Sequence, residues 1–96
     1  MARAKEWLHR LQTGDIDHTQ LDAKMDALLT SDMAKKIAAQ FGPLGDPTSF
    51  TYVGQQEYAP GAMSYIYRAV FKSTVLNEVF SLDATGKISG IQFPPA

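Results

Sequence analysis

The sequence predicts an α+β domain in which three N-terminal helices pack on one face of a four-stranded antiparallel β-meander. Up to Phe41, apolar residues recur every three or four positions, which is the period of helices with one buried face. From Ser49 onward, aromatic and β-branched residues form short runs separated by turn residues, which is the pattern of strands. The connections between these runs are short, and short connections join antiparallel neighbours. This order of elements indicates a helical layer on a small sheet.

The composition is typical of one soluble globular domain and argues against several classes of protein. The 96 residues are 45% hydrophobic and 20% charged, so we assign residues 1–96 to a single domain. Nine basic and ten acidic side chains give a net charge of −1, which argues against nucleic-acid and membrane partners. The chain has no cysteine, which excludes disulfides and thiolate metal ligands. No apolar run approaches the roughly 18 residues that span a bilayer, and no signal peptide is predicted. The compartment is left open, with export expected if the chain is a trimmed fragment.

The first helix is predicted over residues 2–12 and the second over residues 18–29. The apolar face of the first helix comprises Ala4, Trp7, Leu8 and Leu11. Gly14 follows its last turn and suits the positive φ of a helix C-terminus. Asp17 and Gln20 have the spacing of a capping box at the start of the second helix. The buried positions of the second helix are predicted to be Leu21, Met25, Leu28 and Leu29.

The third helix is predicted over residues 31–41. Thr30 or Ser31 can cap its N-terminus, and Gly42 with Pro43 ends it, because proline cannot continue the helical hydrogen bonds. Four strands follow, over residues 49–57, 63–71, 75–82 and 87–93. The last turn has the strongest signal, since Asp83 and Gly86 fit a type I turn followed by a left-handed residue.

The turns set the register of the sheet, and the register decides which residues share a face. The predicted cross-strand pairs are Leu82–Ile88, Phe80–Gly90, Val79–Ile91, Phe71–Leu76 and Tyr67–Phe80. The face that the helices cover then comprises Tyr65, Tyr67, Ala69, Phe71, Leu76, Phe80, Leu82 and Ile88.

The opposite face of the predicted sheet is rich in apolar residues, although a face in water is expected to be polar. Isolated apolar residues on strands are common and favour the pleated conformation, which is one interpretation. The other interpretation is a contact surface for a second copy of the chain or for another protein domain. The interface residues predicted on this face are Ile66, Arg68, Val70, Val79, Ile91 and Phe93.

Glu78 does not fit the predicted pattern, because it falls between two apolar residues on the helix-covered face. A carboxyl group held there near Trp7, Tyr52 and Tyr67 would have a raised pKa and could act as a general acid or base. The same four residues could line a cleft for a small ligand between helices and sheet. The alternatives are a position at the rim of the sheet, or a bulge that moves Glu78 to the other face beside Arg68.

No catalytic residue, metal site or cofactor motif is assigned from the sequence. His9 and His18 lack a second ligand at a useful spacing, and the aspartates from Asp15 to Asp26 do not match a calcium loop. The glycines flank turns and a strand instead of opening a helix, so no phosphate-binding or dinucleotide-binding motif is present.

Three segments together resemble a known class of small domain. They are residues 7–17, residues 45–54 and the run from Tyr65 to Phe71 that leads into residues 78–90. These segments are similar to cystatin-like or nuclear-transport-factor-2-like domains of bacterial proteins, which are often exported and often attached to a serine hydrolase or another enzyme domain. The resemblance implies a curved antiparallel sheet that wraps helices, frequent dimerisation and commonly no known activity. Enzymatic members of that superfamily use an acid or an Asp–His pair in the cone, and no such pair is placed in this chain.

These observations predict a non-catalytic accessory or protein-interaction domain. The alternative is a small-ligand-binding or isomerase-like domain that uses the cleft near Trp7, Tyr67 and Glu78. A third hypothesis is a protease-inhibitor-like module, for which the segment from Val53 to Gln56 is a faint match.

Overall fold

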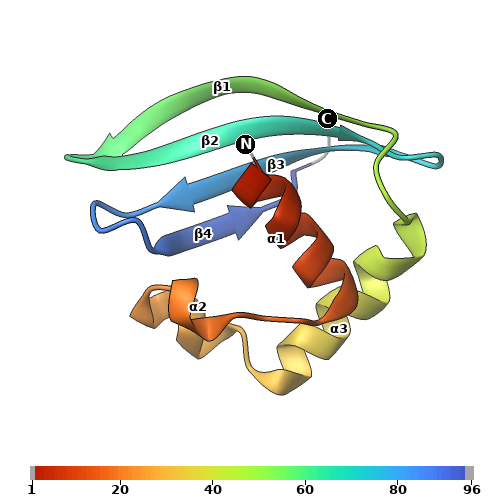
Figure 1. Ribbon diagram of the computed structural model, residues 1–96, viewed down its shortest axis with the longest axis horizontal. Helices are drawn as coiled ribbons and strands as arrows, with labels where there is room; N and C mark the ends of the chain where they lie inside the picture. The colour runs from red at the N-terminus through yellow and green to blue at the C-terminus, as the bar shows by residue number, and fades with distance from the viewer. Residues whose placement is uncertain (1, 95–96) are drawn as a thin grey trace.

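The computed structural model of the protein describes residues 2–94, and in these residues three α-helices precede a four-stranded antiparallel sheet (Figure 1). The helices are α1 (Ala2–Thr13), α2 (Ala23–Leu28) and α3 (Ser31–Phe41), with short 3-10 turns η1 (His18–Gln20) and η2 (Gly42–Leu44). The strands are β1 (Ser49–Ala59), β2 (Ala62–Val70), β3 (Val75–Leu82) and β4 (Ile88–Gln92), and they pair in chain order. The α+β class and the antiparallel meander are therefore as predicted.

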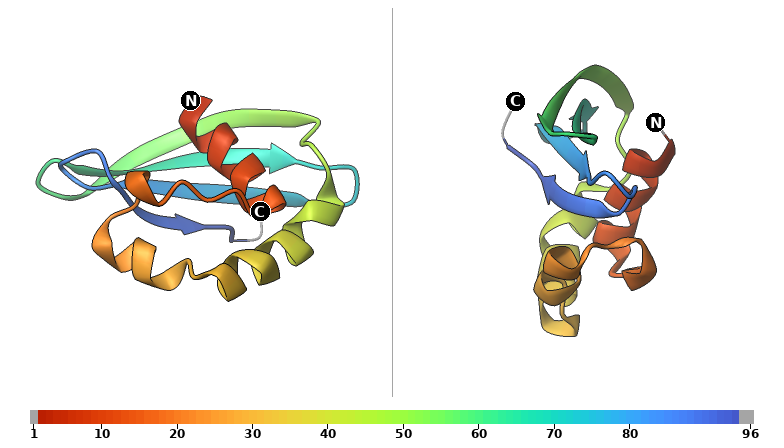
Figure 2. Two further views of the ribbon diagram at one scale, coloured as in Figure 1. Left: turned by 60° about the horizontal axis from the view of Figure 1, so that its bottom comes forward. Right: turned by 90° about the vertical axis from the view of Figure 1, so that its left-hand side faces the viewer.

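Helix α1 supplies most of the helical cover of the sheet. It lies across the concave side of the curved sheet, whereas α2 and α3 lie toward the β4 end (Figures 1 and 2). Helix α3 packs on α1, and α2 packs on β4. The predicted arrangement places all three helices on one face, and in the described residues the opposite face has no helix over it (Figure 2). The helices do not reach across the whole sheet, because much of β1 has no helical cover and most of its residues are exposed.

The core forms where the apolar face of α1 meets β2, β3 and β4. The buried apolar residues are Ala4, Trp7, Leu8, Leu11, Leu21, Met25, Leu29, Ala34, Ala62, Tyr67, Ala69, Phe71, Phe80 and Ile88. The four residues predicted for the buried face of the first helix are all among them. The apolar period of the sequence therefore identified this helix face correctly.

The predicted helix over residues 18–29 is interrupted at Leu21. This residue forms a parallel β-bridge with Ile88, and the backbone N–H of Asp22 donates to the carbonyl of Ile88 (3.0 Å). The Asp22 carboxylate then starts α2 by accepting from a backbone N–H of its first turn (2.8 Å), while Asp17 caps only the short η1 turn. Because the helix restarts in a new orientation, Leu28 is 54% exposed and the prediction that it is buried is wrong.

Strands β2 and β3 pair two residues away from the predicted register. Tyr67 lies opposite Glu78, and Ala69 lies opposite Leu76. The predicted pairs Phe71–Leu76 and Tyr67–Phe80 are therefore wrong. The turn lies one residue earlier than expected, and its closing hydrogen bond runs from the N–H of Phe71 to the carbonyl of Thr74 (2.8 Å). A shift of two residues keeps the alternation of side chains, so the faces of β2 and β3 are unchanged.

Strand β4 contains a β-bulge that the alternation of residues in the sequence does not predict. The observed pairs are Leu82–Ile88, Ser81–Gly90, Phe80–Ile91 and Val79–Gln92. The predicted Leu82–Ile88 pair is thus confirmed, and the predicted Phe80–Gly90 and Val79–Ile91 pairs are wrong. An extra residue between two paired positions reverses the face of every residue that follows it.

The bulge turns Ile91 and Phe93 toward the helices. Both pack against the buried cluster, and the ring of Phe93 lies 4.9 Å from the ring of Phe41 on α3, measured between centroids. The prediction that Ile91 and Phe93 belong to the opposite face is therefore wrong.

Candidate functional site

The four residues predicted to line a ligand cleft lie close together but pack mainly as core. Trp7 and Glu78 are 0% exposed, and Tyr67 is 3% exposed. Tyr67 is the cross-strand neighbour of Glu78, and it shares the buried cluster with Trp7. Tyr52, on the neighbouring strand β1, is 43% exposed and its ring meets the ring of Tyr67 edge-on at 5.7 Å. The residues therefore form a packed layer under α1 and not the walls of one common cleft.

Glu78 is a buried carboxyl group without a partner. Neither carboxyl oxygen has a hydrogen-bond partner among the described residues, and both are shielded from solvent. Burial raises the pKa of Glu78 to about 8, because the charged form loses its hydration. The group is thus predominantly protonated and neutral at pH 7. The predicted place on the helix-covered face is confirmed, whereas the alternatives of a rim position and of a move to the other face are wrong.

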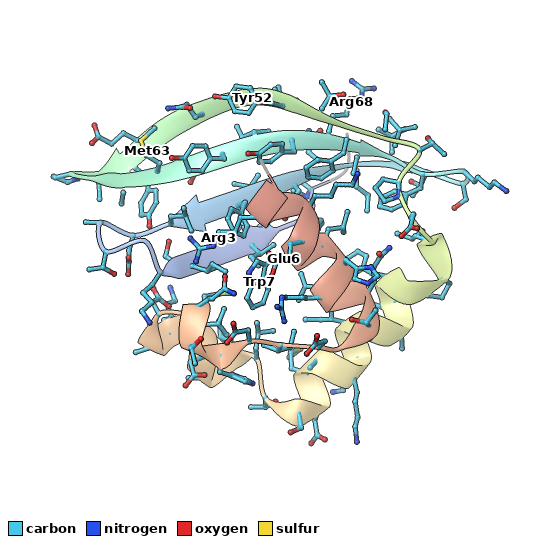
Figure 3. All side chains as sticks on the ribbon, viewed as in Figure 1. Arg3, Glu6, Trp7, Tyr52, Met63 and Arg68 are labelled. Carbon is cyan, nitrogen blue, oxygen red and sulfur yellow. The ribbon has the colours of Figure 1, made fainter. Side chains whose placement is uncertain are left out.

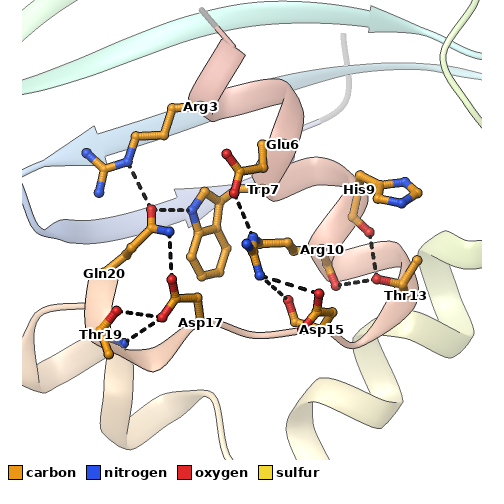
Figure 4. Close-up of polar contacts among 10 residues, drawn as sticks. All are labelled: Arg3, Glu6, Trp7, His9, Arg10, Thr13, Asp15, Asp17, Thr19 and Gln20. Carbon is orange, nitrogen blue, oxygen red and sulfur yellow. Dashed lines mark hydrogen bonds and ion pairs between the residues drawn. The ribbon is translucent and has the colours of Figure 1, made fainter.

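Gln20 joins α1 to the segment that follows it through a polar network (Figure 4). Its Oε1 accepts hydrogen bonds from Nε1 of Trp7 (3.0 Å) and Nε of Arg3 (3.2 Å), and its Nε2 donates to Asp17 (2.9 Å). Hydrogen bonds from Thr19 and Gln20 lower the pKa of Asp17 to about 2. The sequence pattern predicts only a capping-box role for Gln20. Its bonds to Trp7 and Arg3 depend on a fold-back of the chain after α1, for which the sequence offered no signal.

The start of α1 is also tied to the β3–β4 turn. The Nη1 atom of Arg3 donates to the carbonyl of Gly86 (2.9 Å), and Nζ of Lys87 donates to the carbonyl of Thr19 (2.5 Å). Figure 3 shows Arg3 near the beginning of α1, on the side of the strands. The Arg3 guanidinium is therefore held in a fixed place by neutral acceptors.

The side of the sheet turned away from α1 has no helix over it in the described part of the chain (Figure 2). We call this surface the outer face, and its central residues are Ile66, Arg68, Val70, Val75, Asn77 and Val79. Two aliphatic cross-strand pairs, Ile66–Val79 and Val70–Val75, flank the pair Arg68–Asn77. The four aliphatic residues are partly exposed, and Arg68 is exposed. Four of the six predicted interface residues, Ile66, Arg68, Val70 and Val79, thus share this face.

The two histidines, the other candidates for metal or acid–base chemistry, lie on the surface. His9 is exposed on α1, and His18 pairs with Asp26 in an exposed contact of 2.7 Å between Nδ1 and Oδ1. Residues 2–94 contain no cluster of three or more side chains arranged to hold a metal ion. In the same range, no helix combines the length and apolar character needed to cross a membrane.

Comparisons of the chain with protein-family models, curated proteins and solved structures found no match. The structure defines an α+β protein with three helices and a four-stranded antiparallel sheet. The cystatin-like or nuclear-transport-factor-2-like fold stays a prediction.

Proposed function

We propose that the protein is a non-catalytic interaction domain whose outer face packs against the outer face of a second copy. The aliphatic pairs Ile66–Val79 and Val70–Val75 carry this proposal, because they lie partly exposed on a face that no described helix covers. Removing apolar surface from water is favourable by about 25 cal/mol per Å². The resemblance to cystatin-like domains, which implies frequent dimerisation, points in the same direction.

The size of the outer face fits a small dimer interface. The nine residues of β2 span roughly 30 Å, and four strands about 4.8 Å apart give a flat area of roughly 500 Å². Each partner of a standard interface buries about 800 Å², so the expected complex is small and reversible. The flanking pairs are similar in shape, and this similarity suits a two-fold arrangement in which both copies use the same surface.

The sheet edges are less suited to pairing with another chain. Two bulges interrupt β1, between Tyr52 and Gly54 and between Glu57 and Ala59, and bulges disfavour the addition of another strand. The edge of β4 is partly occupied, because Leu21 forms a bridge with Ile88. Packing through the outer face is therefore favoured over extension of the sheet.

The charges of the chain permit self-association. The net charge of −1 produces little long-range repulsion between copies. Arg68 is the charged member of the outer face, and Asn77 lies beside it as a hydrogen-bond acceptor for the Arg68 of a second copy. This pair would fix the relative position of the two sheets, while the aliphatic pairs supply the affinity.

The setting of Glu78 supports a non-catalytic role. A general acid must come within hydrogen-bond distance of its substrate. The Glu78 carboxyl is closed off from solvent by the packed core, and its neighbour across the strands is a buried tyrosine.

Light scattering coupled to gel filtration tests the proposal over a range of concentrations. We expect a concentration-dependent dimer for the unmodified chain. Val79→Lys should weaken it by more than about tenfold, because it buries an unpaired charge. Leu28→Lys is the matched control, since it makes the same kind of change at an exposed site on α2. A monomer at all concentrations, or a dimer lost in Leu28→Lys and kept in Val79→Lys, would contradict the proposal.

A further inference from the structure

A hollow of about 290 Å³ lies between the first turn of α1 and the concave side of β2 and β3. Its lining residues are Arg3, Ala4, Tyr65, Tyr67, Phe80 and Leu82. The volume is near the lower end of the range for small-molecule pockets, which is about 300–1,000 Å³. Three of the lining side chains are aromatic, so the walls suit a single flat ring.

Arg3 places a positive charge at this hollow without a counter-ion. The ion pairs among the described residues are Arg10–Glu6, Arg10–Asp15 and His18–Asp26, so Arg3 takes part in none of them. None of the lining residues is acidic, and the first turn of α1 carries no acidic side chain. Gln20 and Gly86 hold the guanidinium through Nε and one Nη1 hydrogen. Three of its five N–H donors remain for a ligand, and a carboxylate can accept hydrogen bonds from such donors.

Tyr67 supplies a second polar group without a partner. It is 3% exposed, and its hydroxyl makes no hydrogen bond to any residue in 2–94. Among those residues, only the two carboxyl oxygens of Glu78 are both shielded from solvent and without a hydrogen-bond partner. The Tyr67 hydroxyl also has no partner, so it is not fully shielded. It therefore adjoins open space, and Tyr67 lines this hollow. A bound anion could accept its hydrogen bond.

We propose that this hollow binds a small aromatic carboxylate. The carboxylate accepts hydrogen bonds from the remaining N–H groups of Arg3 and from the Tyr67 hydroxyl. The ring of the ligand packs on the side chains of Tyr65 and Phe80, which are neighbours across β2 and β3. Charge complementarity selects the acid over its amide, and the volume selects one ring over two. The site is separate from the outer face, which lies on the other side of the sheet, so binding does not depend on dimer formation.

Nuclear magnetic resonance with phenylacetate as the test ligand examines this proposal. We expect saturable shifts of the backbone amides of Ala4, Tyr67, Phe80 and Leu82. Phenylacetamide has the same shape without the charge, and it should bind at least about tenfold more weakly. Absence of saturable shifts at millimolar phenylacetate, or equal affinity for the acid and the amide, would overturn the proposal.

Two variants and one control assign the interaction to its residues. Arg3→Gln should weaken phenylacetate binding by at least about tenfold, since a hydrogen bond to a charged group is lost with the charge. Tyr67→Phe keeps the ring and removes only the hydroxyl, so it should fold even if Arg3→Gln does not, and it should weaken binding by about fivefold. Lys36→Gln removes one positive charge at an exposed position on α3, outside both the hollow and the outer face, and should leave the affinity unchanged. Unchanged affinity in Tyr67→Phe, or an equal loss in Lys36→Gln, would show that the anion does not occupy this hollow.

Discussion

Tyr67 and Glu78 lie directly opposite each other on β2 and β3, and the carboxyl group of Glu78 has no hydrogen-bond partner among the described residues. Desolvation and the nearby Glu78 raise the pKa of Tyr67, and burial raises the pKa of Glu78 to about 8. Both groups are therefore neutral at pH 7. A neutral pair can be buried in this layer, whereas a charged carboxylate there would be costly.

The free energy of unfolding should fall as the pH rises from about 4.5 to about 8. In this range the unfolded chain releases the proton of Glu78, whereas the folded chain keeps it, so rising pH favours the unfolded state. The raised pKa of Glu78 corresponds to a loss of about 5 kcal/mol in the free energy of unfolding across this pH range. Glu78→Gln should remove this contribution. Urea denaturation at a series of pH values measures the slope.

Glu57→Gln is the matched control for this slope, because Glu57 is exposed on β1 and the change is the same. The free energy of unfolding of the Glu57→Gln variant should depend on pH as it does in the unmodified chain. A Glu78→Gln variant with an unchanged slope would show that the carboxyl group is ionised in the folded protein.

Gln20→Ala should lower the free energy of unfolding by about 1–3 kcal/mol. The substitution leaves the Nε1 hydrogen of the fully buried Trp7 without its acceptor, and it also releases Arg3. Gln40→Ala, at an exposed position on α3, should change stability by less than about 0.5 kcal/mol. Guanidinium denaturation compares the two, and an equal effect would mean that the network around Gln20 does not stabilise the fold.

Gly86→Ala should destabilise the chain by about 1–2 kcal/mol, since Gly86 has a φ of +87° in the β3–β4 turn. The space at this glycine is open, so the cost comes from the backbone alone. Gly54→Ala is the control, because its space is also open and its φ is not positive. That variant should be neutral or stabilised by up to about 1 kcal/mol in thermal denaturation. A Gly86→Ala variant as stable as Gly54→Ala would contradict the structure of the turn.

The bulge in β4 gives Ile91 and Val79 different roles. Ile91→Lys should lower the free energy of unfolding by more than about 2 kcal/mol, because Ile91 packs against the buried cluster. Val79→Lys should change the stability of the isolated subunit by less than about 1 kcal/mol and act on association instead. Denaturation at low concentration separates these effects. A similar fall in the free energy of unfolding in both variants would place Ile91 and Val79 on the same side of the sheet.

Much of the fold could be predicted because local patterns and packing agree. The apolar period of α1 placed Trp7 and Leu11 in the core, and the turn from Asp83 to Lys87 produced the predicted hairpin, closed by hydrogen bonds between these two residues. The alternation along β2 and β3 gave the correct faces, although the turn lies one residue earlier than expected.

The missed features depend on contacts between distant parts of the chain. The helix predicted over residues 18–29 breaks because Leu21 bridges to Ile88, which lies 67 positions later. The bulge in β4 is not encoded by periodicity, and a single extra residue moved Ile91 and Phe93 to the other face. The bonds of Gln20 to α1 arise from tertiary placement as well.

Contacts between methyl groups of two copies test the outer face most directly. A sample mixed from isotope-labelled and unlabelled chains gives nuclear Overhauser effects that arise only between copies. We predict such effects among the methyl groups of Ile66, Val70, Val75 and Val79. Intermolecular contacts confined to Leu28 and Met33 on the helices, or none at concentrations where light scattering detects a dimer, would contradict the account.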